Sequence, residues 1–181
     1  MPIDADRLFR EYHGTLVRYL TRRLGDRDWA EEVAQETFVR ALRQDAIESE
    51  RSWLFAVASN LVRDEARKVA RQRRQLQLLA AEAREVEQES APDEEELTAE
   101  RARETALARK ALESLAERDR QALLLKAEGL DYDEIAKVLE IEKSSVGTTL
   151  SRARRRLAET YDALQDTAQR DTTGSADNAA S

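Results

Sequence analysis

Apolar residues recur at helical spacing along the N-terminal part of the chain. Between Asp6 and about Gln75 they form three stripes, each repeating every three to four residues, as on one face of a helix. The stripes are Leu8, Tyr12, Leu16, Tyr19 and Leu20, then Val33, Phe38, Ala41 and Leu42, then Trp53, Leu54, Val57, Leu61 and Val62. Helices of this length can bury a common core, so the pattern predicts a small helical bundle.

Two polar breaks separate these stripes. The run Gly25-Asp26-Arg27-Asp28 divides the first from the second, and Asp28 followed by Glu31 has the spacing of a capping box at the start of the next helix. The polar segment Gln44–Arg51 divides the second stripe from the third, with Ser52 as a candidate N-cap.

A strongly acidic interval then interrupts the apolar pattern. Residues 85–100 hold eight acidic groups, no basic ones and Pro92, which predicts a solvated linker. A second block of leucines begins near Leu107, and Gly129 is placed to end one of its helices. After Tyr161 the chain has almost nothing to bury and is predicted to be disordered.

The sharpest local pattern lies in residues 132–157. Its apolar residues have the spacing of a helix-turn-helix, in which a small residue lets two helices approach closely. These residues are Ile135, Ala136, Leu139, Ile141 and Val146. Ser144 is a natural N-cap for the second helix. Glu140 occupies the turn position where glycine is common, so it must adopt a left-handed backbone or shift the turn.

The second of these helices suits a DNA groove. A buried stripe of Val146, Leu150, Ala153 and Leu157 turns another set of side chains outward, namely Thr148, Ser151, Arg152 and Arg155. Hydroxyls near a helix start can read base edges in the major groove, while arginines farther along hold phosphates. The pattern therefore favours DNA binding, although a run such as RARRRL is often only a solvated basic face.

The amino-acid composition argues against several fold classes and several kinds of functional site. Only 5 Gly and 2 Pro occur in 181 residues, which argues against sandwiches, barrels and glycine-rich nucleotide folds. There is no cysteine and a single histidine, His13, so we expect no metal site, no cofactor and no enzymatic activity. The apolar runs are too short for a signal peptide or a membrane span. We therefore expect a cytoplasmic protein without direct membrane insertion.

The net charge of -7 is unevenly distributed. Residues 1–74 carry +2 and residues 108–161 carry +1, so the acidity lies between these blocks and after them. Near-neutral blocks with local basic runs should grip phosphates only weakly by themselves.

Two more helices in the N-terminal block carry candidate interaction residues. The helix from Ser52 to Arg74 combines basic residues with Trp53 and Phe55, which is compatible with groove or single-strand binding, although such aromatics are more often core. Residues 28–42 form an acidic ridge of Glu31, Glu32, Gln35 and Glu36 opposite the buried stripe. By itself this ridge is that of an ordinary amphipathic helix.

Three stretches in this order, with an acidic linker between the second and third, resemble a bacterial sigma factor of the two-domain, extracytoplasmic-function kind. They read LFREYHGTLVRYLTRRLGDRDWAEEVAQETFVRAL, SWLFAVASNLVRDEARK and LESLAERDRQALLLKAEGLDYDEIAKVLEIEKSSVGTTLSRARRRL. The expected fold is therefore all-α, with an N-terminal helical bundle and a C-terminal helix-turn-helix domain joined by a flexible linker. The expected boundaries are 1–75 for sigma domain 2, 76–106 for the linker, 107–161 for sigma domain 4, and 162–181 for a disordered tail.

The resemblance also implies partners and site residues. The acidic ridge would dock on the β′ clamp of core RNA polymerase. The loop 43–51 and one helix face would recognise and help melt the -10 promoter element, through Asn60, Arg63, Asp64, Arg67, Lys68 and Arg71. The helix 144–157 would read the -35 element, through Ser144, Ser145, Thr148, Ser151, Arg152 and Arg155. Members of the family are commonly held inactive by an anti-sigma factor, and no small-molecule substrate is implied.

Two departures from the family pattern concern the DNA contacts. The loop 43–51 lacks the glycine and aromatic residues of many relatives, which leaves the -10 base pocket unassigned, and Lys143 occupies a position that is usually apolar. Two other classes of protein remain open. A stand-alone helix-turn-helix regulator would bind DNA without polymerase, and a helical adaptor that binds only protein would be unaffected by changes at Arg152 and Arg155.

Overall fold

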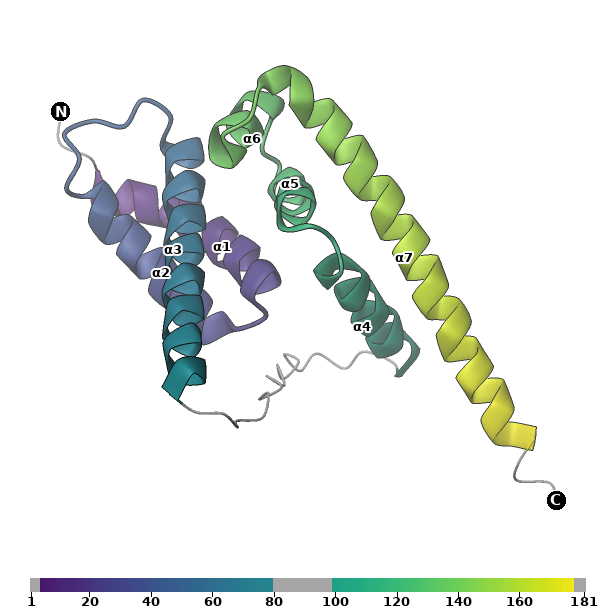
Figure 1. Cartoon of the computed structure of the whole chain (residues 1–181). Coiled ribbons are helices and arrows are strands. Elements are labelled where there is room, and N and C mark those ends of the chain that lie inside the picture. The colour runs from purple at the N-terminus through teal and green to yellow at the C-terminus, as the bar shows by residue number, and fades with distance from the viewer. Residues whose placement is uncertain (1–3, 80–98, 178–181) are drawn as a thin grey trace.

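The computed structural model describes residues 4–79 and 99–177, and over these ranges the chain forms seven helices and no strand (Figure 1). The helices are α1 (Ala5–Leu24), α2 (Arg27–Ala41), α3 (Glu50–Leu79), α4 (Ala99–Glu113), α5 (Glu117–Ala127), α6 (Tyr132–Leu139) and α7 (Lys143–Asp177). The predicted all-α class is confirmed. None of these helices is both long enough and apolar enough to cross a bilayer.

Helices α1–α3 form the N-terminal domain. Its core contains the fully buried Tyr19 and Phe55, whose ring centroids lie 5.2 Å apart. The Tyr19 hydroxyl lies 3.0 Å from the Ser59 Oγ, so the buried phenol keeps a hydrogen-bond partner. Phe55 is therefore a core residue, while Trp53 is only half-buried.

The two predicted N-caps of this domain are wrong. Helix α2 is capped by Asp26, whose carboxylate accepts the Trp29 N–H at 3.0 Å, because the left-handed Gly25 (φ 73°) already ends α1 one residue earlier. The predicted cap Asp28 thus lies inside the first turn. Helix α3 begins at Glu50 rather than after Ser52, since the Ser49 carbonyl already accepts the Trp53 N–H at 2.9 Å.

Helices α4–α7 form the C-terminal domain, in which α6 and α7 make the helix-turn-helix. Gly129 follows α5 in the left-handed conformation (φ 82°), as predicted. Glu140 ends α6 with φ 54° and ψ 49°, so the chain adopts the left-handed turn at a non-glycine residue. The Ile141 N–H then donates to the Ala136 carbonyl at 3.0 Å, which closes the turn. Helix α7 begins at Lys143, so Ser144 lies in its first turn and is not the N-cap.

Three helices extend beyond the predicted domain boundaries. The end of α3 and the start of α4 lie inside the predicted linker 76–106, and α7 continues to Asp177 through most of the predicted disordered tail 162–181. Extending an existing helix avoids a new nucleation step, and the alanine, leucine, arginine and glutamine residues of the α3 and α4 flanks favour helix. The rest of the predicted linker, residues 80–98, and the chain end, 178–181, lie outside the described residues.

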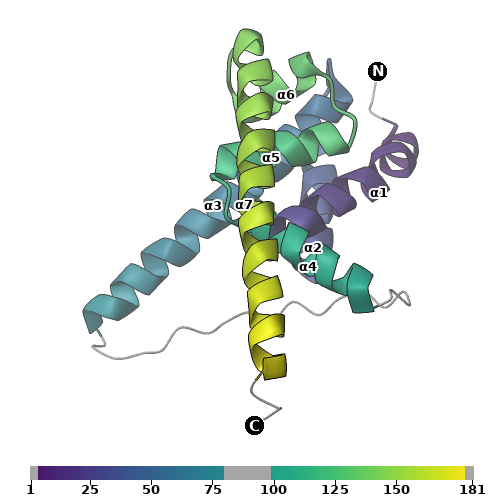
Figure 2. The same cartoon turned by 90° about the vertical axis from the view of Figure 1, so that its right-hand side faces the viewer.

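The two domains pack against each other. Helix α5 contacts α1, and α6 contacts the first turns of α3 (Figures 1 and 2). Buried apolar residues from both domains, such as Leu54 and Leu130, belong to one continuous cluster. The second halves of α3 and α7 project from this packed body (Figure 2).

Candidate nucleic-acid interface

The outward side of the first turns of α7 is polar and open. Its residues Ser144, Ser145, Thr148, Ser151 and Arg155 are all exposed, while Val146, Leu150 and Ala153 are fully buried against the domain core. The predicted inward and outward sides of this helix are therefore correct at these positions. Of the exposed residues, Ser144, Ser145 and Thr148 border an open hollow of about 480 Å³, together with Arg118 of α5. We call Arg118 and these five exposed α7 residues the recognition face.

Arg118 is a candidate that sequence reasoning missed. It lies in the first turn of α5, 26 positions before Ser144, and reaches the same hollow only because α5 packs across α7. The sequence gives no indication of this position beyond the positive charge of Arg118, because the periodicity of α7 does not show which residues of α5 pack beside α7.

Arg152 does not point freely outward as predicted. Its Nε and Nη2 atoms donate to the two carboxylate oxygens of Asp119, at 3.1 and 2.5 Å. Arg156 Nη1 donates to the same carboxylate at 3.3 Å. Asp119 is only 1 % exposed, so this fork ties the recognition helix to α5. Arg152 is half-buried, and it lines the hollow from this anchored position.

The fork also determines the ionisation of Asp119. The hydrogen bond from Arg152, together with the charges of Arg152 and Arg156, lowers the pKa of Asp119 below its ordinary value, although burial opposes this shift. The carboxylate therefore remains charged well into the acid range and keeps α5 and α7 joined.

Replacing Asp119 by Asn is expected to destabilise the protein by about 2 kcal/mol at neutral pH, because hydrogen bonds between charged groups are lost. The ionised carboxylate stabilises the fold above a pH of about 4, and this contribution disappears as the pH falls through the lowered pKa of the folded state. The difference between variant and wild type should therefore shrink in acid, which urea unfolding across that range would measure. Asp133→Asn, which breaks only an exposed pair with Lys143, should change stability little. A difference that persisted in strong acid would contradict this assignment.

Between residues 60 and 71, helix α3 presents a charged face to solvent. Asp64, Arg67, Lys68 and Arg71 are exposed, whereas Asn60 and Arg63 are half-buried nearer the body of the domain. Two ion pairs on this face join residues three positions apart in the chain, and both are long. Arg67 lies 3.8 Å from Asp64, and Lys68 lies 3.7 Å from Glu65. Exposed pairs of this kind contribute little to stability, so these cations are available to a ligand.

The predicted acidic ridge on α2 is present in part. Glu32, Gln35 and Glu36 are exposed, and Glu36 pairs with Arg40 at 2.7 Å. Glu31 instead turns toward α1, where its carboxylate lies 3.0 Å from the His13 Nε2. His13 is thus a helix-packing residue. The described residues contain no cluster of three or more acidic or histidine side chains that could hold a metal.

An apolar patch, which the sequence pattern did not predict, adjoins this ridge. Val39 is 42 % exposed one turn after Glu36, and Leu42, predicted to be buried, is 54 % exposed. Leu42 departs from the buried stripe because α2 ends at Ala41. Phe9 is also 45 % exposed and stacks on His13 with ring centroids 4.2 Å apart. Side chains that pack on one another at a surface leave part of their apolar area open to a partner.

Comparison with known proteins assigns both domains to one family. Residues 8–72 match the model of Sigma-70 region 2, and residues 105–157 match that of Sigma-70 region 4. The chain is 33 % identical over 155 residues to the ferric citrate uptake sigma factor FecI of Escherichia coli (strain K12), covering 83 % of this chain and 87 % of that protein. It is 30 % identical over 152 residues to the RNA polymerase sigma factor YlaC of Bacillus subtilis (strain 168), covering 81 % and 86 %.

A shorter match supports this assignment, and one solved structure has a similar fold. The ECF RNA polymerase sigma factor SigL of Mycobacterium tuberculosis is 42 % identical over 65 residues, which is 33 % of this chain and 37 % of that protein. The fold is similar to the sigma factor RpoE of Bartonella quintana, solved in complex with the anti-sigma factor NepR, with a TM-score of 0.68 and 23 % identity over 88 % of this chain and 97 % of that one. The chain therefore belongs to the sigma-70 family, as an extracytoplasmic-function sigma factor that directs transcription initiation by RNA polymerase at promoters.

Proposed function

We propose that each of three surfaces of this sigma factor makes a different contact required for transcription initiation. The recognition face of the C-terminal domain reads the -35 element, the charged face of α3 binds and helps melt the -10 element, and the acidic ridge of α2 docks on the β′ clamp of core polymerase. The observation that carries this proposal is the recognition face, where the hydroxyls of exposed α7 residues and the Arg118 guanidinium border one open hollow.

The recognition face has the chemistry of a major-groove reader. Ser144, Ser145 and Thr148 present short hydroxyl side chains that can donate to or accept from base edges. Arg155 is 71 % exposed and its only ion pair on this helix, with Glu159, is 3.8 Å long, so a phosphate can replace that partner. Arg118 offers a second guanidinium from the other side of the hollow. Arg152 contributes through its anchored position, which sets the tilt of α7 on α5.

The α3 face suits a melted strand. Arg67, Lys68 and Arg71 lie on consecutive exposed turns, where they can follow a phosphate backbone. Asn60 and Arg63 lie closer to the loop 43–51 and are the candidates for contacts to unstacked bases, with Asp64 beside them. Flipping a base costs a few kcal/mol, so these contacts must offset that cost for melting to proceed.

The α2 ridge has the make-up of a protein interface. Glu32, Gln35 and Glu36 supply a polar border, and Val39 and Phe9 supply exposed apolar area. Apolar side chains at the centre of a patch with polar residues around them are typical of protein contacts. Glu31, held by His13, stiffens the junction of α1 and α2 instead of touching the clamp directly.

One further partner is proposed by comparison with a solved structure. RpoE of Bartonella quintana was solved bound to the anti-sigma factor NepR. We propose that an anti-sigma factor likewise binds this protein in the cytoplasm and keeps it inactive. The factor itself performs no bond-making step, because the polymerase supplies the catalytic centre.

The test is transcription in vitro with core polymerase of the source organism on fragmented genomic DNA, followed by mapping of the RNA 5′ ends. The expected result is a set of starts that depends on the factor and shares two upstream elements at fixed spacing. Folded factor and active core that yield no new starts would refute the proposal. Tight sequence-specific binding by the factor alone would instead support a stand-alone regulator.

A further inference from the structure

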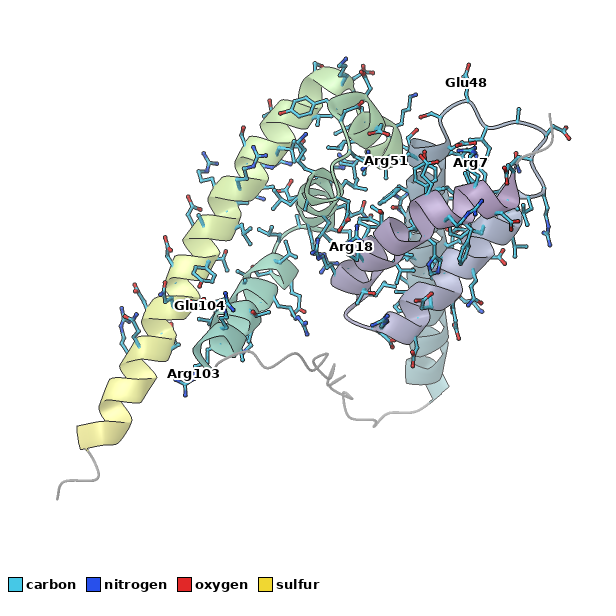
Figure 3. The ribbon with its side chains drawn as sticks, turned by 180° about the vertical axis from the view of Figure 1, so that it is seen from behind. Arg7, Arg18, Glu48, Arg51, Arg103 and Glu104 are labelled. Atoms are coloured by element: carbon cyan, nitrogen blue, oxygen red, sulfur yellow. The ribbon has the colours of Figure 1, made fainter. Side chains whose placement is uncertain are left out.

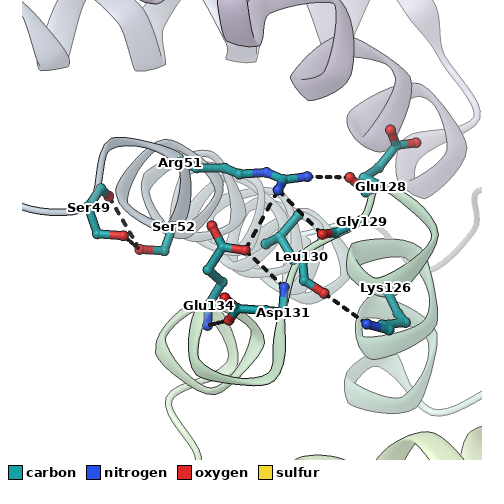
Figure 4. A network of polar contacts seen from close by, with 9 residues as sticks. All are labelled: Ser49, Arg51, Ser52, Lys126, Glu128, Gly129, Leu130, Asp131 and Glu134. Carbon is teal, nitrogen blue, oxygen red and sulfur yellow. Dashed lines mark hydrogen bonds and ion pairs between the residues drawn. The ribbon is translucent and has the colours of Figure 1, made fainter.

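The charged side chains at the contact between the two domains neutralise one another. Figure 3 shows Arg18 and Arg51 on the side of the N-terminal domain that faces α5 and α6. Arg51 Nη1 donates to the Gly129 carbonyl at 3.3 Å, and Nη2 donates to the Glu128 carbonyl (Figure 4). The Glu128 carboxylate in turn accepts Arg18 Nη2 at 3.2 Å and Arg22 Nη1 at 2.8 Å. Each of these groups therefore has its partners within the chain.

The hollow beside α7 differs from this contact, because its cations have donors to spare. Arg118 is exposed on the lining and forms no ion pair with any residue that the structure describes. Arg152 also lines the hollow and gives Nε and Nη2 to Asp119, which leaves its Nη1 for a ligand. Asp119 pairs with Arg156 as well, and the lining itself holds one carboxylate, that of the exposed Glu142. Three guanidinium groups therefore stand against two carboxylates at and beside the hollow, which favours an anion.

Thr149 supplies a hydroxyl at the floor of the hollow. This residue is only 6 % exposed, whereas the other hydroxyl side chains of the lining are exposed. The Thr37 hydroxyl on α2 donates to the Val33 carbonyl at 2.7 Å, but the Thr149 hydroxyl has no such partner among the described residues. In that part of the chain, Arg120 Nε is the one side-chain nitrogen or oxygen that lacks both a partner and solvent. The Thr149 hydroxyl therefore reaches solvent through the hollow, where it can donate to a ligand.

The start of α7 adds the polarity of a helix N-terminus to the same hollow. Helix α7 begins at Lys143, and the first N–H groups of a helix have no acceptor within it. The Ser145 N–H already donates to the Glu142 carbonyl at 2.9 Å. The positive end of the helix dipole therefore lies at Ser144, on the lining. A phosphate group suits such a site, because it combines negative charge with several acceptor oxygens.

We infer that this hollow is a phosphate-binding pocket, in which the factor holds inorganic phosphate or a small phosphate monoester. Arg118 and Arg152 Nη1 donate to the phosphate oxygens from the sides, and Thr149 donates from the floor. The volume of about 480 Å³ lies in the range of sites that hold small ligands. Because the rim of the pocket belongs to the recognition face, a bound phosphate and the -35 duplex exclude each other. This exclusion rests on the proposed -35 contact, whereas the pocket itself does not.

The pocket can be tested by nuclear magnetic resonance on the isotope-labelled, full-length chain. Inorganic phosphate and then glycerol phosphate are titrated while chloride keeps the ionic strength constant. The backbone N–H signals of the first turns of α7 should shift and saturate. Arg118→Ala should weaken this binding about tenfold, because a hydrogen bond between charged groups is lost. Arg101→Ala, at an exposed arginine of α4, should leave it unchanged. Shifts that do not saturate, or that change equally in the two variants, would overturn the pocket.

Two further substitutions on the lining should change phosphate binding in opposite directions. Thr149→Val keeps the shape of the side chain and removes the hydroxyl, so binding should weaken about fivefold. Glu142→Gln removes the carboxylate of the lining, so binding should tighten about threefold. Thermal unfolding of each variant shows whether the domain remains folded. Weaker phosphate binding by a folded Glu142→Gln variant would overturn the assignment of an anion to this hollow.

The exclusion of DNA has its own readout, the affinity of the holoenzyme for a labelled -35 duplex at constant ionic strength. Phosphate at ten times its dissociation constant should weaken duplex binding about tenfold for the wild type and about threefold for Thr149→Val. Duplex binding that is indifferent to phosphate would overturn the exclusion.

Failure of the proposed -35 contact is seen separately. It would appear as unchanged duplex binding by a variant with Ser151→Ala and Arg155→Ala, two residues of the recognition face that do not line the hollow. That result leaves the phosphate titration unaffected, because the titration contains no DNA.

Discussion

Replacing Glu32 and Glu36 together by lysine is expected to abolish assembly with core polymerase, with a loss of affinity of at least about a hundredfold, because like charges brought together at an interface cost several kcal/mol. Both carboxylates are exposed on α2. Glu36 has only an intrahelical partner, Arg40, and its loss should cost little stability. The fold should therefore survive while binding is lost.

The measurement is a titration of labelled factor with core polymerase, combined with thermal unfolding of each variant. The matched control is Asp162→Lys with Asp166→Lys on the distal part of α7, which changes the net charge by the same amount at exposed positions. Core binding that is weakened equally by both variants would show that overall charge, and not the acidic ridge, governs the interaction. Normal binding by the ridge variant would remove α2 from the interface.

Replacing Arg118 and Arg155 together by alanine is expected to weaken binding of the assembled holoenzyme to promoters that depend on the -35 element by about ten- to a hundredfold. Both side chains are exposed members of the recognition face. Each lost phosphate contact should also reduce the slope of log affinity against log salt concentration by about one. Core binding should be unchanged, because neither residue lies on the N-terminal domain.

Filter binding or fluorescence anisotropy over a range of salt concentrations checks this expectation. Arg101→Ala with Arg103→Ala on α4 is the control, since both arginines are exposed in the same domain. Figure 3 shows Arg103 on α4, far from the first turns of α7. An unchanged salt slope in the Arg118 and Arg155 variant would exclude both residues from the DNA contact. Arg152→Ala should behave differently and also lower stability, because it breaks the fork to Asp119.

The helix-turn-helix was predictable from sequence because its determinants are local. Ile135, Ala136 and Val146 are within eleven positions of one another, so a single periodic pattern describes both helices. The left-handed backbone of Glu140 was foreseen for the same reason, as one of the two ways in which the turn could form.

The rest of the site depends on contacts between residues far apart in the chain. Asp119 and Arg152 are separated by 33 positions, and Arg18 and Glu128 by 110. Neither the composition nor the periodicity of a segment shows which distant residue its side chains will contact. Helical periodicity therefore placed Arg152 outward, and the sequence did not determine how the two domains pack. The start of α2 was mispredicted by two residues. Asp26 and Asp28 are both good N-cap residues, and only the left-handed backbone of Gly25 selects Asp26.

Helix α7 runs without a break far beyond the helix-turn-helix of the C-terminal domain. Its 35 residues span about 50 Å, and the recognition face occupies only the first turns. Any change in the angle at which these turns enter a groove is carried, as in a rigid rod, to the far end near Asp177 and is largest there. Under the proposed -35 contact, the far end of α7 would therefore move with the orientation of the factor on its promoter.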